Sequence, residues 1–539
     1  MINGFRVFAT IFASALISAC SPASDSDINV NGLVFCSESN PSSFNPQLDT
    51  SGTTADASAH QIYDRLLDFD TETGNIIPGL ADSWLVSGDG LVYTFQLKRR
   101  VAFHSTPYFT PTRTFNADDV LFSINRWRQA EHPYHNVSGG LYPYFQSLDL
   151  AKNIVAVKRI NGYRVEIHLA QPDSSFLANL ATDFAVMLSA EYGKHLLSQG
   201  DPSAIDNQPI GTGPYKFVEY RPNHFIRFAR HNSYWRGAVS QEQLVFDITP
   251  RSALRLAKLI TGECDISVFP AQSELDAIRD NEALELLEKP GLNVGFWAFN
   301  TQKPPFDNPD VRRALAMAID KNTIIDTVYF DSARRATSLL PPSSWAHQAN
   351  ADDVNYNPVQ ARRLLQASGI EPGFEMTLWA MPVQRAYNPN AMKMARLMKS
   401  YLKDVGVEAT IVSYDWTTFR NNLQQGLHDS VLIGWSADNV DPDNFYRPLL
   451  TCSAIPTGTN RAMWCNPAYD ELIEQALLVN DTERRKQIYA QANRMLYEQM
   501  PLMPIAHAFR FQAQRSNVNN STINTYGGVR LGSVVKQND

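Results

Sequence analysis

The second half of the chain contains a stretch in which strand-like and helix-like patterns alternate. An apolar strand pattern starts at Phe374, a helical pattern follows from about residue 390 and stops before Gly406, and residues 407–412 form a second strand pattern. A short helical pattern at 416–425 and a third strand pattern at 430–435 complete the stretch. Strands that alternate with helices indicate a parallel sheet, because each helix returns the chain to the same end of the sheet. We therefore predict an α/β fold for this region.

Two opposite charges follow the first and the third of these strands. Arg385 lies just past the first strand and Asp438 just past the third. If the strands are parallel, both charges lie at the edge of the sheet where ligands of such sheets bind. A charge at the end of an apolar strand is costly to bury without a partner. A ligand with both a carboxylate and an ammonium group, such as a short peptide, would pair with both charges.

The first half of the chain has a different character. Residues 31–249 read mainly as antiparallel β-structure, with alternating patterns at 91–98 and 164–169. After Gly291 helices begin, as at Asn308-Pro309, where a capping residue precedes a first-turn proline. A chain of 539 residues is too long for one core. We expect a β-rich lobe and an α/β lobe with the ligand between them.

Composition excludes several classes of function. The net charge is −8 and no polybasic run occurs, so nucleic acid and anionic membrane surfaces are poor partners. No nucleophile elbow, phosphate loop or paired zinc motif is present. We therefore predict a protein that is not an enzyme and that needs neither a metal nor another cofactor. A hydrolase remains formally open, but no catalytic constellation supports it.

The N-terminus has the pattern of a secretory signal. Residues 1–19 contain one cation, Arg6, an apolar stretch and small residues before Cys20, and they are too short for a stable membrane span. The segment ending in Cys20 resembles a bacterial lipobox, in which the cysteine is lipidated, and residues 20–30 have the polar composition of a tether. The alternative is cleavage after Ala19 that leaves a free thiol. We favour lipidation, since an exposed thiol is a liability in an oxidising compartment.

The other four cysteines allow two disulfides in one of three pairings. Cys452 and Cys465 bracket a loop that contains proline and glycine, which favours a local bridge. Cys36 with Cys264 would then join distant segments. A four-cysteine zinc site would need close paired spacing, which is absent.

Several longer motifs occur in a fixed order along the chain. They are FNPQ at 44–47, SGTT at 51–54, PGLADSW at 78–84, FNADDV at 115–120, PIGTGPY at 209–215 and YW at 234–235. With these motifs the chain resembles the bacterial extracellular solute-binding proteins of family 5, the dipeptide and oligopeptide group, from Leu33 to the C-terminal region. The resemblance implies a monomeric periplasmic binding component of an ABC importer that hands a short peptide to its permease in a Gram-negative cell envelope.

The resemblance also implies a domain organisation. The fold would be the hinged, two-lobed periplasmic binding protein fold (type II, large cluster) with an extra inserted domain. The β-rich lobe would combine residues 31–63, 213–290 and 509–539, the inserted domain would be 64–212, and the α/β lobe 291–508. The hinge would lie near Gly291 and Phe509, and the lobes would close on the ligand.

Two branches of the family match different parts of the chain. As in the dipeptide receptors, Arg385 would hold a peptide carboxylate and Asp438 its ammonium group. The other residues that match binding positions are Thr50, Gly52 and Thr53, through their backbone, and the aromatic residues Tyr387, Trp416 and Trp435. The family pairing of cysteines would be Cys36 with Cys264 and Cys452 with Cys465.

Segments such as 227–231 and 447–452 are instead similar to Sap-type receptors, whose ligands would be cationic antimicrobial peptides or haem. Arg385 separates the two interpretations, because a dipeptide should need it and the alternative ligands should not. From pattern alone, the sequence favours a structural role for Asp438, as an ion-pair partner or a turn cap, and Trp416 and Trp435 would equally suit a core.

Overall fold

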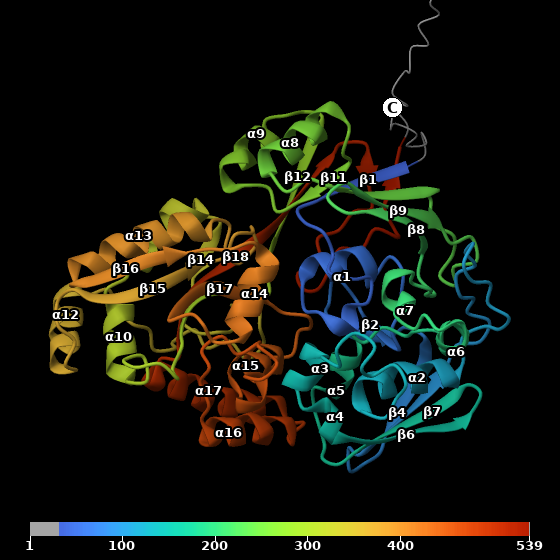
Figure 1. The fold of residues 1–539 in the computed structure, drawn as a ribbon, viewed down its shortest axis with the longest axis horizontal. Helices are drawn as coiled ribbons and strands as arrows, with labels where there is room; N and C mark the ends of the chain where they lie inside the picture. Colours follow the sequence, from blue (N-terminus) through green and yellow to red (C-terminus); the bar gives the residue numbers. More distant parts are fainter. Residues whose placement is uncertain (1–31, 538–539) are drawn as a thin grey trace, which may run out of the picture.

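The computed structural model describes residues 32–537. The predicted signal peptide, the tether and Cys20 lie outside the described residues. Figure 1 shows three groups of elements, with α1 (Gly52–Ser58) near the place where they meet. Within residues 32–537, no helix combines the length and the apolar character needed to cross a bilayer.

A sheet of twelve strands runs through two of these groups. In order across the sheet its main strands are β16 (Val407–Val412), β15 (Phe374–Ala380), β17 (Ser430–Ser436), β13 (Asn293–Phe299), β18 (Leu502–Arg515), β11 (Ile266–Val268), β1 (Gly32–Ser37), β10 (Gln243–Ile248), β9 (Phe225–Arg230) and β8 (Tyr215–Arg221). Two further strands, β12 (Leu284–Pro290) and β14 (Ala333–Arg335), pair with β18. The first half of β18 pairs with β13 and β14 and its second half with β11 and β12. This one strand therefore joins both halves of the sheet.

The third group contains an antiparallel sheet of four strands. In order these are β4 (Ala81–Val86), β5 (Val92–Leu97), β7 (Arg164–Leu169) and β6 (Ile154–Asn161). The small pairs β2 (Leu67–Phe69) with β3 (Ile76–Pro78) and β19 (Val518–Asn519) with β20 (Val535–Lys536) complete the strands of the described residues. The predicted strands at 91–98 and 164–169 are confirmed as β5 and β7.

The helices separate into those before and those after β13. The first set is α2 (Ala117–Arg128), α3 (Pro143–Ser147), α4 (Leu150–Asn153), α5 (Phe176–Leu180), α6 (Ala190–Gln199), α7 (Ala204–Asn207), α8 (Ser252–Thr261) and α9 (Leu275–Arg279). The second set is α10 (Pro309–Met317), α11 (Lys321–Ile324), α12 (Pro358–Ala367), α13 (Ala391–Asp404), α14 (Trp416–Gln424), α15 (Asp443–Leu450), α16 (Pro467–Leu477) and α17 (Thr482–Gln499). The predicted start at Asn308 is confirmed, because its side chain accepts a hydrogen bond from the backbone N–H of Asp310.

The prediction of mainly antiparallel strands in the first half was incomplete. Strand β1 runs parallel to both β10 and β11. Parallel neighbours need a long crossover connection, and the whole four-stranded sheet lies between β1 and β10 along the chain. Local alternation of apolar residues does not reveal which distant strand a segment will pair with.

The predicted parallel arrangement around β15 is confirmed. β15 pairs in parallel with β16 on one side and with β17 on the other. Helix α13 connects β15 to β16, and α14 connects β16 to β17. The carboxyl ends of β15 and β17 therefore lie at one edge of the sheet, where Arg385 and Asp438 follow.

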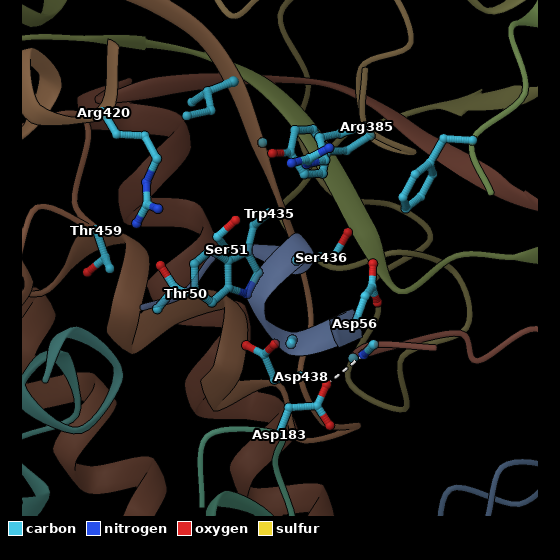
Figure 2. Close-up of a pocket in the computed structure, with 18 of the residues that line it drawn as sticks. Thr50, Ser51, Asp56, Asp183, Arg385, Arg420, Trp435, Ser436, Asp438 and Thr459 are labelled. Atoms are coloured by element: carbon cyan, nitrogen blue, oxygen red, sulfur yellow. Dashed lines mark hydrogen bonds between the residues drawn. The ribbon is translucent and has the colours of Figure 1, made fainter. Parts of the chain in front are cut away.

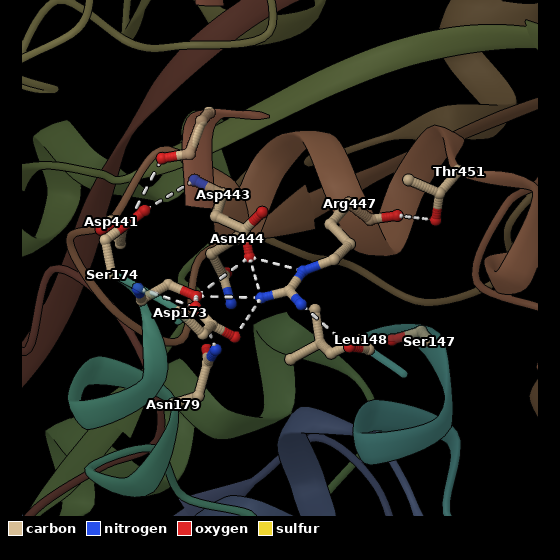
Figure 3. Close-up of polar contacts among 12 residues, drawn as sticks. Ser147, Leu148, Asp173, Ser174, Asn179, Asp441, Asp443, Asn444, Arg447 and Thr451 are labelled. Carbon is tan, nitrogen blue, oxygen red and sulfur yellow. Dashed lines mark hydrogen bonds and ion pairs between the residues drawn. The ribbon is translucent and has the colours of Figure 1, made fainter. Parts of the chain in front are cut away.

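Helix α15 follows β17 and contacts the third group of elements through the buried side chain of Arg447 (Figure 3). The Arg447 side chain is only 9% exposed and lies 2.6 Å from Asp443 and 3.3 Å from Asp173. It also donates to the backbone carbonyl of Leu148 and to the hydroxyl of Ser175, both at 2.9 Å. This arginine balances two buried carboxylates from segments far apart in the sequence.

We expect Arg447→Met to destabilise the protein by about 3–5 kcal/mol, because Asp173 and Asp443 would be left buried without their cation. Thermal and urea unfolding followed by circular dichroism measure the change. The matched control is Arg494→Met, which removes an exposed arginine from α17. Equal unfolding midpoints for the two variants would contradict the role assigned to Arg447.

Candidate functional site

A cavity lies where α1, the carboxyl ends of β15 and β17, and the segment after β18 meet (Figure 2). Seven of the eight residues predicted for ligand binding line it, namely Thr50, Gly52, Arg385, Tyr387, Trp416, Trp435 and Asp438. The eighth, Thr53, is buried, and its hydroxyl lies 2.9 Å from that of Ser51 instead of lining the cavity. The predicted residues are thus brought together from four segments that are separate in the sequence.

Two glycines leave the space into which the loop that carries Arg385 and Tyr387 packs. Gly295 and Gly434 face each other across β13 and β17. A Cβ on Gly434 would lie 2.4 Å from the ring of Tyr387, and one on Gly295 would lie 2.3 Å from the Tyr387 carbonyl oxygen. The Tyr329 hydroxyl donates a hydrogen bond of 2.8 Å to that same carbonyl. The loop therefore fits only over a strand pair without side chains at these positions.

One of the two terminal nitrogens of the Arg385 guanidinium already has a partner within the protein. Its Nη1 lies 2.7 Å from Oε1 of Glu38, and both side chains are less than 10% exposed. Its Nη2 is buried and has no hydrogen-bond partner among residues 32–537. The guanidinium also lies 5.6 Å from the ring centre of Trp416. The sequence predicted a ligand carboxylate as the partner of Arg385 and did not single out Glu38, which pairs with it from the other half of the sheet.

Asp438 is held by a turn that also orients Trp435. The Asn444 side-chain oxygen accepts hydrogen bonds from the Asp438 backbone N–H at 3.0 Å and from the Trp435 indole at 3.1 Å. Oδ2 of Asp438 is buried and, in the described part of the chain, has no hydrogen-bond partner. Burial, with the negative charge of Asp183 added, raises the pKa of Asp438 well above its ordinary value. A cationic donor would satisfy this carboxylate.

Two further aspartates that the sequence did not single out lie near Asp438. Asp56 accepts a hydrogen bond of 2.9 Å from the backbone of Val529, and burial together with Glu38 raises its pKa to about 7. Asp183 lies 2.6 Å from Nε2 of His60. Although burial opposes ionisation, the neighbouring His60 lowers the pKa of Asp183 below its ordinary value. Only the position of Asp56, two residues after the SGTT motif, could have pointed to it.

The other end of the cavity is basic. Arg420 lines it and pairs with Asp49 at 2.6 Å, and Arg461 and Thr459 line the same region. Thr459 and Arg461 belong to the loop that the Cys452–Cys465 disulfide closes. Both predicted disulfides are confirmed, the second joining Cys36 to Cys264. The only sequence signal for Arg461 was its position in the loop between Cys452 and Cys465.

Figure 2 shows Asp56, Asp183 and Asp438 on one side of the cavity and Arg385 and Arg420 on the other. Arg510 also lines the cavity, and its charge interacts with all three aspartates, so that the first side has an excess of negative charge. Residues 32–537 contain no group of three or more His, Cys, Asp or Glu side chains placed to hold a metal ion. The arrangement can bind a ligand with a cationic and an anionic end. It contains no arrangement of nucleophile and base for covalent chemistry in its lining.

A model of the bacterial extracellular solute-binding proteins, family 5 Middle, matches residues 75–457. The chain belongs to this family. It is 41% identical over 500 residues to the dipeptide-binding protein of Escherichia coli (strain K12), covering 93% of this chain and 94% of that protein. It is 40% identical over 539 residues to the peptide transport periplasmic protein SapA of Salmonella typhimurium, covering 100% and 98% of the two chains.

A solved structure agrees with these relatives. The dipeptide binding protein from Pseudoalteromonas sp. SM9913 in complex with Met-Leu matches with a TM-score of 0.92 at 47% identity, covering 94% of this chain and 100% of that one. The predicted α/β periplasmic binding protein fold is therefore confirmed. As a family 5 member the protein is a solute-binding protein and not an enzyme.

We expect Asp56→Asn to stabilise the ligand-free protein at pH 8 but not at pH 4. The raised pKa means that the folded protein keeps the Asp56 proton between about pH 4 and pH 7 while the unfolded chain releases it. The contribution of Asp56 to the free energy of unfolding therefore falls as the pH rises from about 4 to 7. Asparagine cannot ionise, so the variant does not lose this stability. The variant should melt roughly 2–4 °C above the wild type at pH 8 and level with it at pH 4.

Differential scanning calorimetry at the two pH values measures this difference. The control is Asp280→Asn, an exposed acid outside the cavity, whose melting temperature should stay near that of the wild type at both values. An Asp56→Asn variant that is no more stable than the wild type at pH 8 would contradict the assignment.

Proposed function

We propose that this protein is the periplasmic substrate-binding component of a peptide ABC importer, which closes two lobes around a short, dipeptide-like peptide and delivers it to its permease. The observation that carries the proposal is the unpaired Asp438 carboxylate at one end of a cavity whose other end holds Arg385. Membership of family 5, with relatives named as dipeptide-binding proteins, supports a peptide as the ligand with these two charges.

Recognition would use the ends of the peptide and not its side chains. The peptide ammonium group would donate to Asp438, and the carboxylate would accept from the free Nη2 of Arg385. The backbone of Thr50 and Gly52, which line the cavity, would pair with the peptide backbone, whereas Thr53 does not line it. Tyr387, Trp416 and Trp435 would provide apolar walls. Water in the remaining space would let peptides with different side chains bind.

The lobes would be residues 31–63 with 213–290 and 509–539, the inserted domain 64–212, and the second lobe 291–508. The two crossings near Gly291 and Phe509 would act as the hinge. This division is supported by β18, which changes its partners from β13 and β14 to β12 near Phe509. The pairs Arg385–Glu38 and Arg420–Asp49 would then join the two lobes in the closed state.

We also propose that residues 1–19 are a signal peptide and that Cys20 is lipidated, so that residues 20–30 tether the receptor to a membrane of the cell envelope. The receptor would act as a monomer with its cognate ABC permease. Electrospray mass spectrometry of the mature protein tests the lipid directly, because the diacylglycerol modification adds a defined mass at the N-terminus.

We expect Asp438→Ala to weaken dipeptide binding by about 2–5 kcal/mol, because the buried ammonium group would lose its carboxylate partner. Isothermal titration calorimetry with Ala-Ala and Met-Leu measures the dissociation constants. Asp280→Asn serves as the control for a lost acid outside the cavity. Dipeptide affinity equal to that of the wild type in Asp438→Ala would reject the proposed role of this carboxylate.

A Sap-type receptor for cationic antimicrobial peptides or haem is the alternative function. Two observations favour this alternative. The similarity to SapA covers 100% of this chain, and Glu38 already forms an ion pair with the Arg385 guanidinium. A ligand without a clamped carboxylate would leave that ion pair intact.

We expect Arg385→Met to weaken dipeptide binding at least tenfold, since a desolvated carboxylate would lose a charge-assisted hydrogen bond. Calorimetry with dipeptides and titration with haemin, followed by absorbance near the Soret band, compare the two functions. Unchanged dipeptide affinity in the variant, or haem binding by the wild type without dipeptide binding, would favour the alternative.

A further inference from the structure

The basic end of the cavity contains one arginine that no acid balances. Arg461 forms no ion pair with an acid that the described part of the chain contains, and its Nη1 is buried there without a hydrogen-bond partner. Arg385 and Arg420 differ from it, because Glu38 and Asp49 pair with them. The burial of a guanidinium without a counter-charge is costly. An anionic group from outside the chain would remove that cost.

The surroundings of Arg461 increase this cost. Burial and the positive charge of Arg420 lower the pKa of Arg461 to about 9. Tyr387 acts in the opposite direction, but no carboxylate contributes. Of these two neighbouring arginines only Arg420 has an acidic partner, Asp49, and this leaves an excess of positive charge in the wall of the cavity.

This excess lies where the cavity continues into a second cleft. Arg461, Arg420, Thr459 and Trp416 line both spaces. In Figure 2, Arg420 and Thr459 lie together on the side of the cavity away from Asp183 and Asp438. Arg461 therefore lines the same cavity as Asp438 and Arg385, in the part that continues into the second cleft. The adjoining cleft leaves room for a group that a neutral dipeptide lacks.

We propose that Arg461, together with Arg420 and Thr459, forms a second carboxylate-binding subsite. The inference rests on the proposed peptide-binding function and extends it to ligands with an additional or more distant negative charge. Two sources supply that chemistry: the acidic side chain of the second residue of a dipeptide, and the C-terminal carboxylate of a tripeptide. A guanidinium binds either carboxylate with two parallel hydrogen bonds. The Thr459 hydroxyl, which lies 3.1 Å from the Thr457 hydroxyl and 3.4 Å from the Ala454 carbonyl oxygen, would add a third donor if it turned from these partners to the ligand.

Four peptides separate the two sources by calorimetry. Ala-Glu against Ala-Gln isolates the side-chain carboxylate, and trialanine against dialanine isolates the more distant terminus. In Arg461→Met, we expect dialanine affinity within threefold of the wild type. The preference for Ala-Glu over Ala-Gln should fall at least tenfold if the subsite takes a side chain. The affinity for trialanine relative to dialanine should fall at least tenfold if it takes a terminus.

Further variants keep the test independent of folding. Arg461→Lys should restore part of the lost preference, because the charge remains while the paired geometry is lost. Arg461→Met should melt no lower than the wild type, because it removes an unpaired, partly buried charge. Arg461→Gln repeats the test with a polar side chain.

Three outcomes overturn the subsite. Both ratios unchanged in Arg461→Met, or equal weakening of all four peptides, would assign Arg461 a merely structural role while leaving the peptide-binding function in place. A wild-type protein that binds none of the four peptides would overturn the proposed function, and the subsite with it.

Discussion

The charges around the cavity are buried, and each one therefore needs a partner inside or outside the chain. Glu38 pairs with Arg385, His60 with Asp183 and Asp49 with Arg420. Even with these pairs, a carboxylate oxygen of Asp438 and guanidinium nitrogens of Arg385 and Arg461 have no hydrogen-bond partner within residues 32–537. Because an unpaired charge in a low-dielectric site is costly, the protein is most stable when a ligand supplies both missing charges. Binding specificity follows from which charges the fold leaves unmatched.

The same requirement connects parts of the chain that are distant in sequence. Glu38 follows β1, whereas Arg385 follows β15, so their ion pair exists only when the two halves of the large sheet are close. Arg447 connects α15 to the segment around Asp173 in the same way. Strand β18 keeps the two halves of the sheet covalently continuous. A ligand that competes for Arg385 would thus act on the contact between the two halves as well as on the cavity.

Much of the local structure was predictable because it depends on neighbouring residues. Apolar periodicity located β15, β16 and β17, and the helices between them implied their parallel direction. From that direction alone, Arg385 and Asp438 were placed at one edge of the sheet. Glu38, Asp56 and Asp183 could not be placed, since they reach the cavity from segments whose own patterns contain no sign of each other. The parallel pairing of β1 was missed for the same reason.

The sequence by itself determined the strands and helices, the opposite charges at one sheet edge and the resemblance to family 5, because these depend on short-range periodicity and on motifs. The pairing of Cys36 with Cys264 followed only from that resemblance. Only the tertiary structure decided which charges are neutralised. Whether Arg385 is free, Asp438 unpaired or Arg461 uncompensated depends on distances between residues hundreds of positions apart. Electrostatic energy in a buried site changes steeply over a few ångströms, and those distances arise only when the chain has folded.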